Sequence, residues 1–158
     1  MISITKKFIN FPFAHRQPSH PGHCHLIHGH NWSFEFEFGC EVLEPGTGFV
    51  VDFGALKWLR AYLEEQFDHT LVLNSDDPWL PHLQMHNAHL ESAIGQRVAK
   101  IVEVPNCGAE GLAVLLHDVV NGMLAQHPKL AERGVCVTRV VVYEDEKNAA
   151  VFTAPSHL

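Results

Sequence analysis

The segment CHLIHGH, residues 24–30, combines one thiol with three imidazoles in seven positions. Imidazoles and thiolates are common zinc ligands, and a catalytic zinc site needs three protein ligands and one open position. His28 and His30 are two residues apart, so on a β-strand both side chains lie on the same face. The spacing therefore predicts a pair of metal ligands at one end of a strand.

A third ligand is predicted from the strand that precedes this segment. Residues 9, 11, 13 and 15 are Ile, Phe, Phe and His, and a period of two places them on one face. His15 ends this strand, and a hairpin with the strand that begins at His28 would bring three imidazoles together. The alternative for His28 and His30 alone is a chance His-x-His in a chain with 13 histidines. The position of His15 favours the metal site.

Two further segments could move protons. Cys24 lies just before the predicted ligands, where a dication or an imidazolium would favour a thiolate able to act as nucleophile or proton acceptor. Asp68 and His69 are adjacent, and an Asp beside a His can fix the imidazole tautomer and serve a proton relay. Each segment also has a non-catalytic interpretation. Cys24 could be a buried thiol without a chemical role, and Asp68 and His69 could belong to a surface loop.

Glu144 follows the apolar strand RVVVY and is either the start of a solvated turn or an acceptor for a ligand. A carboxylate matches a guanidine-like edge, such as N2 and N3 of a pterin, in a bidentate way. His82, His86 and His89 have helical spacing and could bind a second metal. No Asp or Cys completes that set, so a solvated helix face is the favoured interpretation.

Composition restricts the class of protein. The 158 residues, 46% of them hydrophobic, predict a single domain over 1–158. No apolar run approaches the roughly 20 residues of a membrane span, and no signal peptide is evident, so we expect a cytoplasmic protein that binds no membrane. Four scattered cysteines predict reduced thiols. A net charge of −7 without a Lys/Arg run argues against nucleic-acid binding.

The elements that must position these residues follow from periodicity. Strands are expected at 3–15 and 28–38, and a helix at 53–67 with Asp52 as its N-cap. A second helix is expected at 106–126, with Leu112, Leu115, Leu116, Val119 and Met123 on one side. A hairpin around EDEKN is expected within 134–152. The order strand–strand–helix–helix–strand–strand predicts an α+β fold, with a His-rich, moderately helical segment at about 81–100.

Read in chain order, several motifs resemble the 6-pyruvoyl-tetrahydropterin synthase family, most closely its bacterial branch that forms 6-carboxy-tetrahydropterin in the queuosine pathway. The motifs are FPFAHR, CHLIHGHNW, GFVVDFGALK, FDHTLVLN, NCGAEGLA and VVVYED. The spacing Cys-x-x-x-His-Gly-His is similar to that of the carboxy-forming branch. The match covers nearly the whole chain and leaves an insertion at about 76–100.

The resemblance implies the tunnelling fold (T-fold), an antiparallel α+β subunit with two helices on one face of the sheet. Such subunits join into trimeric barrels, and two trimers stack into a homohexamer with sites between subunits. By resemblance, Zn²⁺ would be held by His15, His28 and His30. Cys24 would be the general acid/base, with Asp68 and His69 as its relay. Glu144 and Glu110 would bind the pterin.

The implied reaction converts 7,8-dihydroneopterin triphosphate into 6-carboxy-5,6,7,8-tetrahydropterin, acetaldehyde and triphosphate. Lys6, Lys7 and Arg16 are candidate triphosphate contacts. The family's usual Asn-Pro-Thr-Ser/Thr-Glu is replaced by residues 106–110, NCGAE, and its usual Thr after the pterin-binding Glu is Asp145. The alternatives are a pyruvoyl- or hydroxymethyl-forming sister activity, a non-catalytic metal or pterin binder, and an interaction protein with a His-rich surface.

Overall fold

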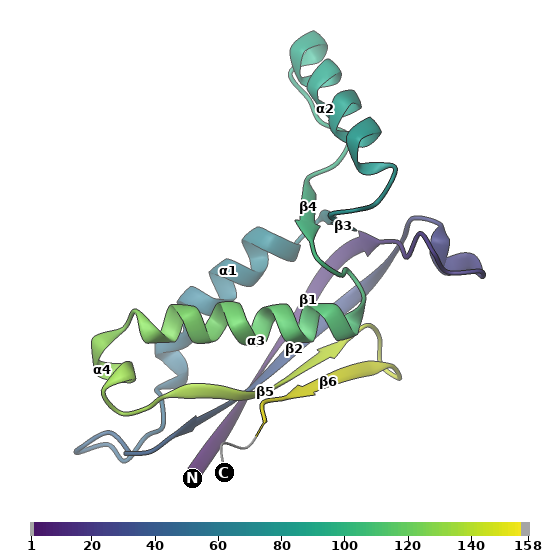
Figure 1. Ribbon diagram of the computed structural model, residues 1–158. Coiled ribbons are helices and arrows are strands. Elements are labelled where there is room, and N and C mark those ends of the chain that lie inside the picture. The colour runs from purple at the N-terminus through teal and green to yellow at the C-terminus, as the bar shows by residue number, and fades with distance from the viewer. Residues whose placement is uncertain (1, 156–158) are drawn as a thin grey trace.

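Two long antiparallel strands form the centre of the sheet (Figure 1). The computed structural model describes residues 2–155. Its six strands lie in the order β4–β3–β1–β2–β5–β6. They are β1 (Ile2–His15), β2 (His28–Cys40), β3 (Thr70–Asn74), β4 (Ile101–Val104), β5 (Cys136–Tyr143) and β6 (Ala149–Thr153). The helices are α1 (Lys57–Phe67), α2 (Leu80–Ile94), α3 (Ala109–Ala125) and the short α4 (Pro128–Ala131).

The β1–β2 pairing confirms the expected hairpin and sets the register of the histidines. His15 pairs with His28, and Phe13 pairs with His30. The register shifts between Phe8 and Phe11, where Asn10 has a φ of 69°. This bulge inserts one extra residue into β1. Phe8 is therefore buried, and Ile9, expected on the same face as Phe11 and Phe13, is 50% exposed.

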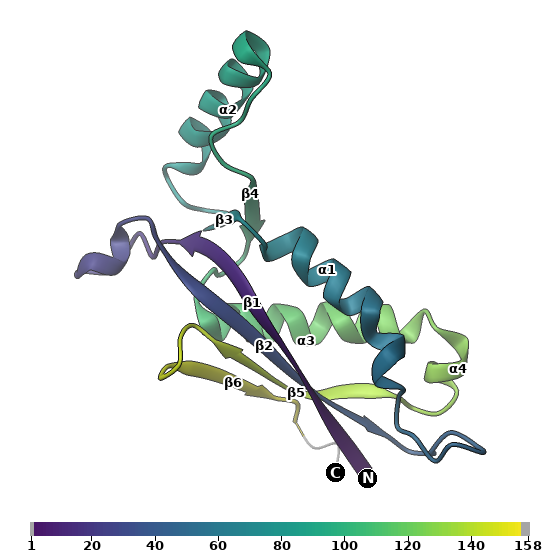
Figure 2. The same ribbon diagram turned by 180° about the vertical axis from the view of Figure 1, so that it is seen from behind.

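One apolar core lies between the sheet and the helices α1 and α3. The alternating residues of β2, namely Trp32, Phe34, Phe36 and Phe38, are all 0% exposed. They share this core with Leu59 and Leu63 of α1 and with Leu112 and Leu116 of α3. Both helices therefore cover the same face of the sheet, as expected (Figures 1 and 2).

The helix boundaries refine the sequence expectations. Asp52 is a cap, since its carboxylate accepts a hydrogen bond from the Gly54 amide at 2.8 Å, and a 3₁₀ turn (Phe53–Leu56) precedes α1. On α3, Val119 and Met123 are only partly buried, whereas Val120 and Leu124 are buried. In the C-terminal half of α3, the buried positions are therefore one residue later in the sequence than expected.

The sheet is mixed rather than wholly antiparallel, which corrects the expectation. β3 runs parallel to β1, and β4 runs parallel to β3. Neither short strand was expected, because parallel pairing depends on crossover connections that local periodicity does not reveal. The segment at about 76–100 supplies one of these connections. Its helix α2 extends away from the sheet as an arm (Figures 1 and 2).

The base of the arm, residues 75–83, is attached by a second, smaller apolar cluster. Leu71, Leu73 and Leu80 form its buried centre, and Leu83 and Ile101 pack around them. The outer part of the arm is exposed, including Met85 at 62% and Ile94 at 63%. Among the described residues, no helix is long and apolar enough to cross a membrane.

Candidate metal centre and adjoining hollow

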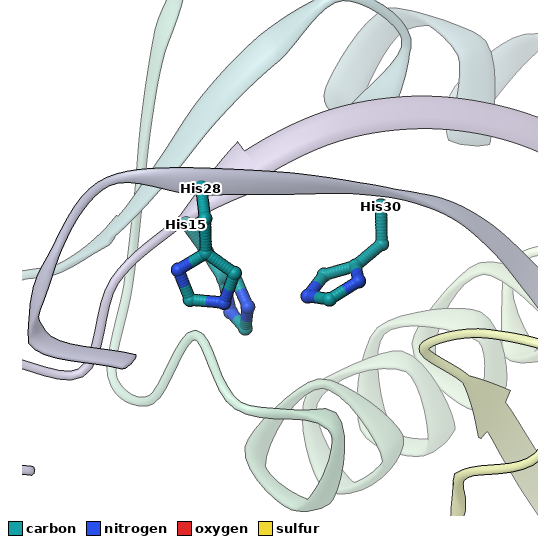
Figure 3. Close-up of side chains that lie close together, drawn as sticks. All are labelled: His15, His28 and His30. Carbon is teal, nitrogen blue, oxygen red and sulfur yellow. The ribbon is translucent and has the colours of Figure 1, made fainter. Parts of the chain in front are cut away.

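Three histidines meet where β1 ends and β2 begins. One ring nitrogen each of His15, His28 and His30 lies within 4.8 Å of the other two. The ring centroids are 4.6 Å apart for His15 and His28, and 5.0 Å apart for His28 and His30. Figure 3 shows all three imidazoles on the same side of the strand pair. Within residues 2–155, this is the one group of three or more candidate ligands that comes together in this way.

Backbone carbonyls orient two of the rings. His15 Nδ1 lies 3.0 Å from the Cys107 carbonyl oxygen, and His28 Nδ1 lies 2.8 Å from that of Leu26. A carbonyl oxygen can only accept, so each Nδ1 carries the proton and donates. The Nε2 lone pair of each ring is then available, in the arrangement typical of metal-binding histidines.

The buried nitrogens fit a metal ion. His15 is 3% exposed, and its Nε2 is buried without a hydrogen-bond partner in the described structure. Buried polar atoms are rarely left without a partner, because their lost hydration is then uncompensated. Three imidazoles match the protein ligand set of a catalytic zinc site, in which the fourth position is taken by water or substrate. The donor set therefore fits such an ion.

Burial also keeps His15 in the form that binds metal. Desolvation lowers the pKa of His15, and the neighbouring His28 and His30 lower it further. The carbonyl of Cys107 and the carboxylate of Glu144 act in the opposite direction without overcoming the effect of burial. A neutral imidazole is the species that coordinates a cation, so less proton competition is expected at this ligand.

Glu144 lies directly beside the cluster. Its Oε1 is 3.2 Å from His30 Nε2, and the two side chains are 30% and 23% exposed. The His30 nitrogen is buried and makes no well-aligned hydrogen bond, so the contact is one of proximity and charge. The carboxylate thus contacts His30 and also lines a neighbouring hollow.

The hollow has a volume of about 360 Å³ and is lined by both glutamates predicted to bind substrate. Glu110 comes from the first turn of α3, and Glu144 follows β5. Lys147 and Asn148 line it from the β5–β6 turn. The size suits a small heterocyclic ligand, since small-molecule pockets occupy roughly 300–1,000 Å³.

Asp145, which stands where the family usually has Thr, stabilises the turn between β5 and β6. Its Oδ1 accepts hydrogen bonds from the backbone amides of Lys147 and Asn148, both at 2.7 Å. These bonds lower the pKa of Asp145 below its ordinary value of 3.8. The side chain therefore shapes the turn that carries Lys147 and Asn148 to the hollow. Sequence reasoning identified neither lining residue, although the polar EDEKN turn was visible.

The expected proton-transfer residues do not contact the three histidines within one chain. Cys24 is partly buried in a 3₁₀ turn (His23–His25), and its carbonyl accepts from the Gln17 amide at 2.8 Å. Asp68 Oδ1 and His69 Nδ1 are 3.0 Å apart, so that pair does form. The His69 side chain is 81% exposed and that of Asp68 is 41% exposed. The described chain provides neither with a hydrogen bond or ion pair to the histidine cluster.

Other candidate residues have different surroundings. His82, His86 and His89 are exposed on α2, consistent with the solvated face favoured above. Arg16, a candidate triphosphate contact, is instead paired with buried Asp77. Lys7 places its ammonium group 3.6 Å from the centre of the Tyr143 ring. Sequence reasoning also missed Cys107, whose carbonyl orients His15, although the NCGAE segment was noted as unusual.

Comparisons with known proteins agree with these features. The family model described as 6-pyruvoyl tetrahydropterin synthase matches residues 3–155. A 6-carboxy-5,6,7,8-tetrahydropterin synthase from Rickettsia conorii is 30% identical over 146 residues, covering 91% of this chain and 94% of the relative. One from Aquifex aeolicus is 29% identical over 130 residues, covering 82% and 75%.

Solved structures share the architecture. An uncharacterised protein from Wolinella succinogenes superposes with a TM-score of 0.79 at 22% identity, over 98% of both chains. A 6-pyruvoyl tetrahydropterin synthase from Plasmodium vivax gives a TM-score of 0.62 at 16% identity, over 98% of this chain and 99% of that one. At such identities the likeness shows the fold alone, and it confirms the expected T-fold.

Proposed function

Because the chain belongs to the 6-pyruvoyl tetrahydropterin synthase family, we propose that it is a zinc-dependent 6-carboxy-tetrahydropterin synthase. The family consists of pterin synthase lyases, and the chain is an enzyme of this class. The proposed reaction converts 7,8-dihydroneopterin triphosphate and water into 6-carboxy-5,6,7,8-tetrahydropterin, acetaldehyde and triphosphate. The observation that carries the proposal is the unpartnered, buried Nε2 of His15 within a three-histidine cluster beside a hollow lined by Glu144.

The first role of the residues is to hold the metal. His15, His28 and His30 would bind Zn²⁺ and leave an open position for substrate. When bound, the ion supplies a Lewis acid that polarises side-chain oxygens of the substrate and acidifies the adjacent C–H bond. The carbonyls of Cys107 and Leu26 keep the two Nδ1 protons in place, so His15 and His28 present neutral nitrogens.

The second role is to hold the pterin ring. The Glu144 carboxylate would accept two hydrogen bonds from the guanidine-like edge at N2 and N3. Glu110 lines the same hollow and would contact the ring from the start of α3. Because Glu144 is 3.2 Å from His30, a ring bound to this carboxylate would place its side chain beside the metal.

The third role is to move the proton, and it points to a site shared between subunits. We assign the acid/base to Cys24 and the relay to Asp68 and His69. The exposure of His69 in a single chain supports a role at a neighbouring subunit's site. A homohexamer built from two trimers would complete such sites. The proposal includes a cytoplasmic location and a step in queuosine synthesis.

The test is to identify products. Zinc-loaded protein is incubated with 7,8-dihydroneopterin triphosphate, and the pterins and acetaldehyde are measured by mass spectrometry. Formation of 6-carboxy-tetrahydropterin with equimolar acetaldehyde is expected. A pyruvoyl or hydroxymethyl pterin would assign the chain to a sister activity. Zinc binding at one ion per chain without turnover would make it a non-catalytic binder.

A further inference from the structure

The metal-ligand end of β1 is joined to the base of the arm by a buried ion pair. Arg16 follows His15 directly, and its Nε lies 2.8 Å from Asp77 Oδ2. The Asp77 side chain is 0% exposed and that of Arg16 is 14% exposed. Removing one member of such a pair leaves the other charge buried without compensation. Arg16 Nε and Asp77 Oδ2 make no well-aligned hydrogen bond, so the pair acts through proximity and charge.

The same carboxylate starts the arm. Asp77 Oδ1 accepts a hydrogen bond from the Trp79 amide at 2.8 Å, and the Asp77 carbonyl accepts from the Leu80 amide at 3.0 Å. One oxygen of Asp77 therefore caps the turn before α2 while the other faces Arg16. Asp77 therefore connects the Arg16 side chain, next to His15, with the first turn of the arm.

Cys107 makes a second set of contacts to the segment formed by His15 and Arg16. It is 0% exposed, and its thiol donates to the Arg16 carbonyl at 3.0 Å. Its amide donates to Asn74 Oδ1 at 2.7 Å, at the end of β3. Its carbonyl accepts from His15 Nδ1. Cys107, whose carbonyl orients the His15 ring, is thus hydrogen-bonded both to the Arg16 backbone and to Asn74 at the end of β3, the strand that leads into the arm.

We propose that Asp77 and Cys107 are positioning residues for the metal ligand His15, so that the Arg16–Asp77 ion pair and the hydrogen bonds of Cys107 set the metal affinity of the site. The inference rests on the metal centre of the proposed function and adds two residues to its supporting shell. Groups that orient a ligating histidine typically change metal affinity by about 10–100-fold when altered.

The main test is Asp77→Asn in the full chain. Metal affinity is measured with Zn²⁺ in competition with a chromophoric chelator, and the ligand geometry by the visible spectrum of the Co²⁺-loaded protein, both without substrate. We expect about 10–100-fold weaker Zn²⁺ binding and an altered Co²⁺ spectrum. Unchanged affinity and spectrum would overturn the inference. Absence of metal binding by the wild-type protein would instead overturn the proposed metal centre itself.

Two control variants separate positioning from general stability. Glu91→Gln makes the same change in an exposed pair on the arm, where Glu91 Oε1 lies 2.8 Å from Arg97 Nη2. Leu83→Ala loosens the apolar cluster at the base of the arm without touching Arg16. Both should retain wild-type Zn²⁺ affinity and Co²⁺ spectrum. A loss in Leu83→Ala equal to that in Asp77→Asn would show that general loosening of the arm is sufficient, and would overturn the role of the ion pair.

Cys107→Ala provides an independent variant if Asp77→Asn does not fold. The substitution removes the Sγ bond to the Arg16 carbonyl and keeps the backbone carbonyl that faces His15. We expect weaker Zn²⁺ binding than in the wild type, partly restored in Cys107→Ser, because a hydroxyl can donate the same bond. Equal affinities in wild type, Cys107→Ala and Cys107→Ser would overturn the assignment of Cys107.

Discussion

Glu144 Oε1 lies 3.2 Å from His30 Nε2, so a carboxylate that faces the hollow also touches a predicted metal ligand. In the proposed function, this contact would connect recognition of the pterin ring with the metal site. A ligand that pairs with Glu144 would draw the carboxylate toward itself, and its distal atoms would lie on the side of the imidazoles. The distance between the proposed ring-binding group, Glu144, and the proposed metal ligand His30 depends on the turn after β5, which carries Glu144.

Glu144→Gln should separate pterin binding from metal binding. The amide keeps the shape of the side chain but cannot accept two hydrogen bonds at the N2 and N3 edge. Loss of a charged hydrogen-bonding partner predicts about 10–100-fold weaker pterin binding. Zn²⁺ should remain at one ion per chain. Pterin affinity is measured by fluorescence titration with neopterin, and metal content by elemental analysis.

Glu146→Gln is the matched control for that experiment, because Glu146 lies two residues further along the same turn and is exposed. It should bind neopterin as the wild type does. Equal losses in the two variants would contradict a specific role of Glu144, since the effect would then follow from the charge of the turn.

Cys24→Ala should stop catalysis while leaving zinc in place. A positioned general acid/base contributes about 10²–10⁴-fold to rate, and Cys24 is outside the three-histidine cluster. We expect kcat to fall by that range with unchanged metal content. Steady-state product formation measures the effect. Cys136→Ala, which changes another partly buried thiol, should keep wild-type activity. Comparable turnover by Cys24→Ala and wild type would remove Cys24 from the mechanism.

Subunit sharing can be tested by complementation. Cys24→Ala and His69→Ala homo-oligomers should each be inactive. In mixed oligomers, a site that takes Cys24 from one chain and His69 from another is intact in roughly a quarter of random pairings. Co-expressed and differently tagged chains should therefore recover about a quarter of wild-type activity. Recovery close to zero would place both residues in the site of a single chain.

The three-histidine cluster could be predicted from the sequence more fully than the proposed proton relay, for a physical reason. The period of two and the hairpin geometry are local properties, so the opposition of His15 and His28 could be derived from spacing. Asp68 and His69 also form their pair as expected, but both side chains are exposed, and the partners that we propose for them belong to a neighbouring subunit. No single-chain pattern states which surface another copy covers.

Other features could not be predicted from the sequence because they depend on contacts between distant segments. Because of the bulge after Phe8, Ile9 lies on the exposed face of β1. Positions 9 and 10 are Ile and Asn, so no Gly or Pro in the sequence indicated a bulge there. The strand TLVLN is too short for periodicity to distinguish it from a loop. Asp77 lies in the polar segment NSDDP, where no local pattern indicates that Arg16 contacts it in the folded chain. Such pairs become visible only when the topology is known.

Asp145 gives a prediction with a defined pH dependence. The amide of Lys147 and the side chain and amide of Asn148 donate to its carboxylate and lower its pKa below 3.8. The stabilisation of the turn is therefore present above pH 3.8 and is lost as the pH falls through the lower pKa of the folded state. An NMR titration of the Asp145 carboxyl carbon should give a midpoint below 3.8. A midpoint at or above that value would contradict the turn geometry.

The same geometry predicts what Asp145→Ala does near neutral pH. The variant loses the acceptor for the Lys147 and Asn148 amides, so the turn is less ordered and these two residues are less well placed at the hollow. Neopterin should bind several-fold more weakly, by about the effect of one or two hydrogen bonds, while zinc content stays at one per chain. Asp145→Asn keeps an oxygen acceptor and should recover most of the affinity. If alanine and asparagine are equally impaired, the charge of Asp145 rather than its capping bonds is what the hollow requires.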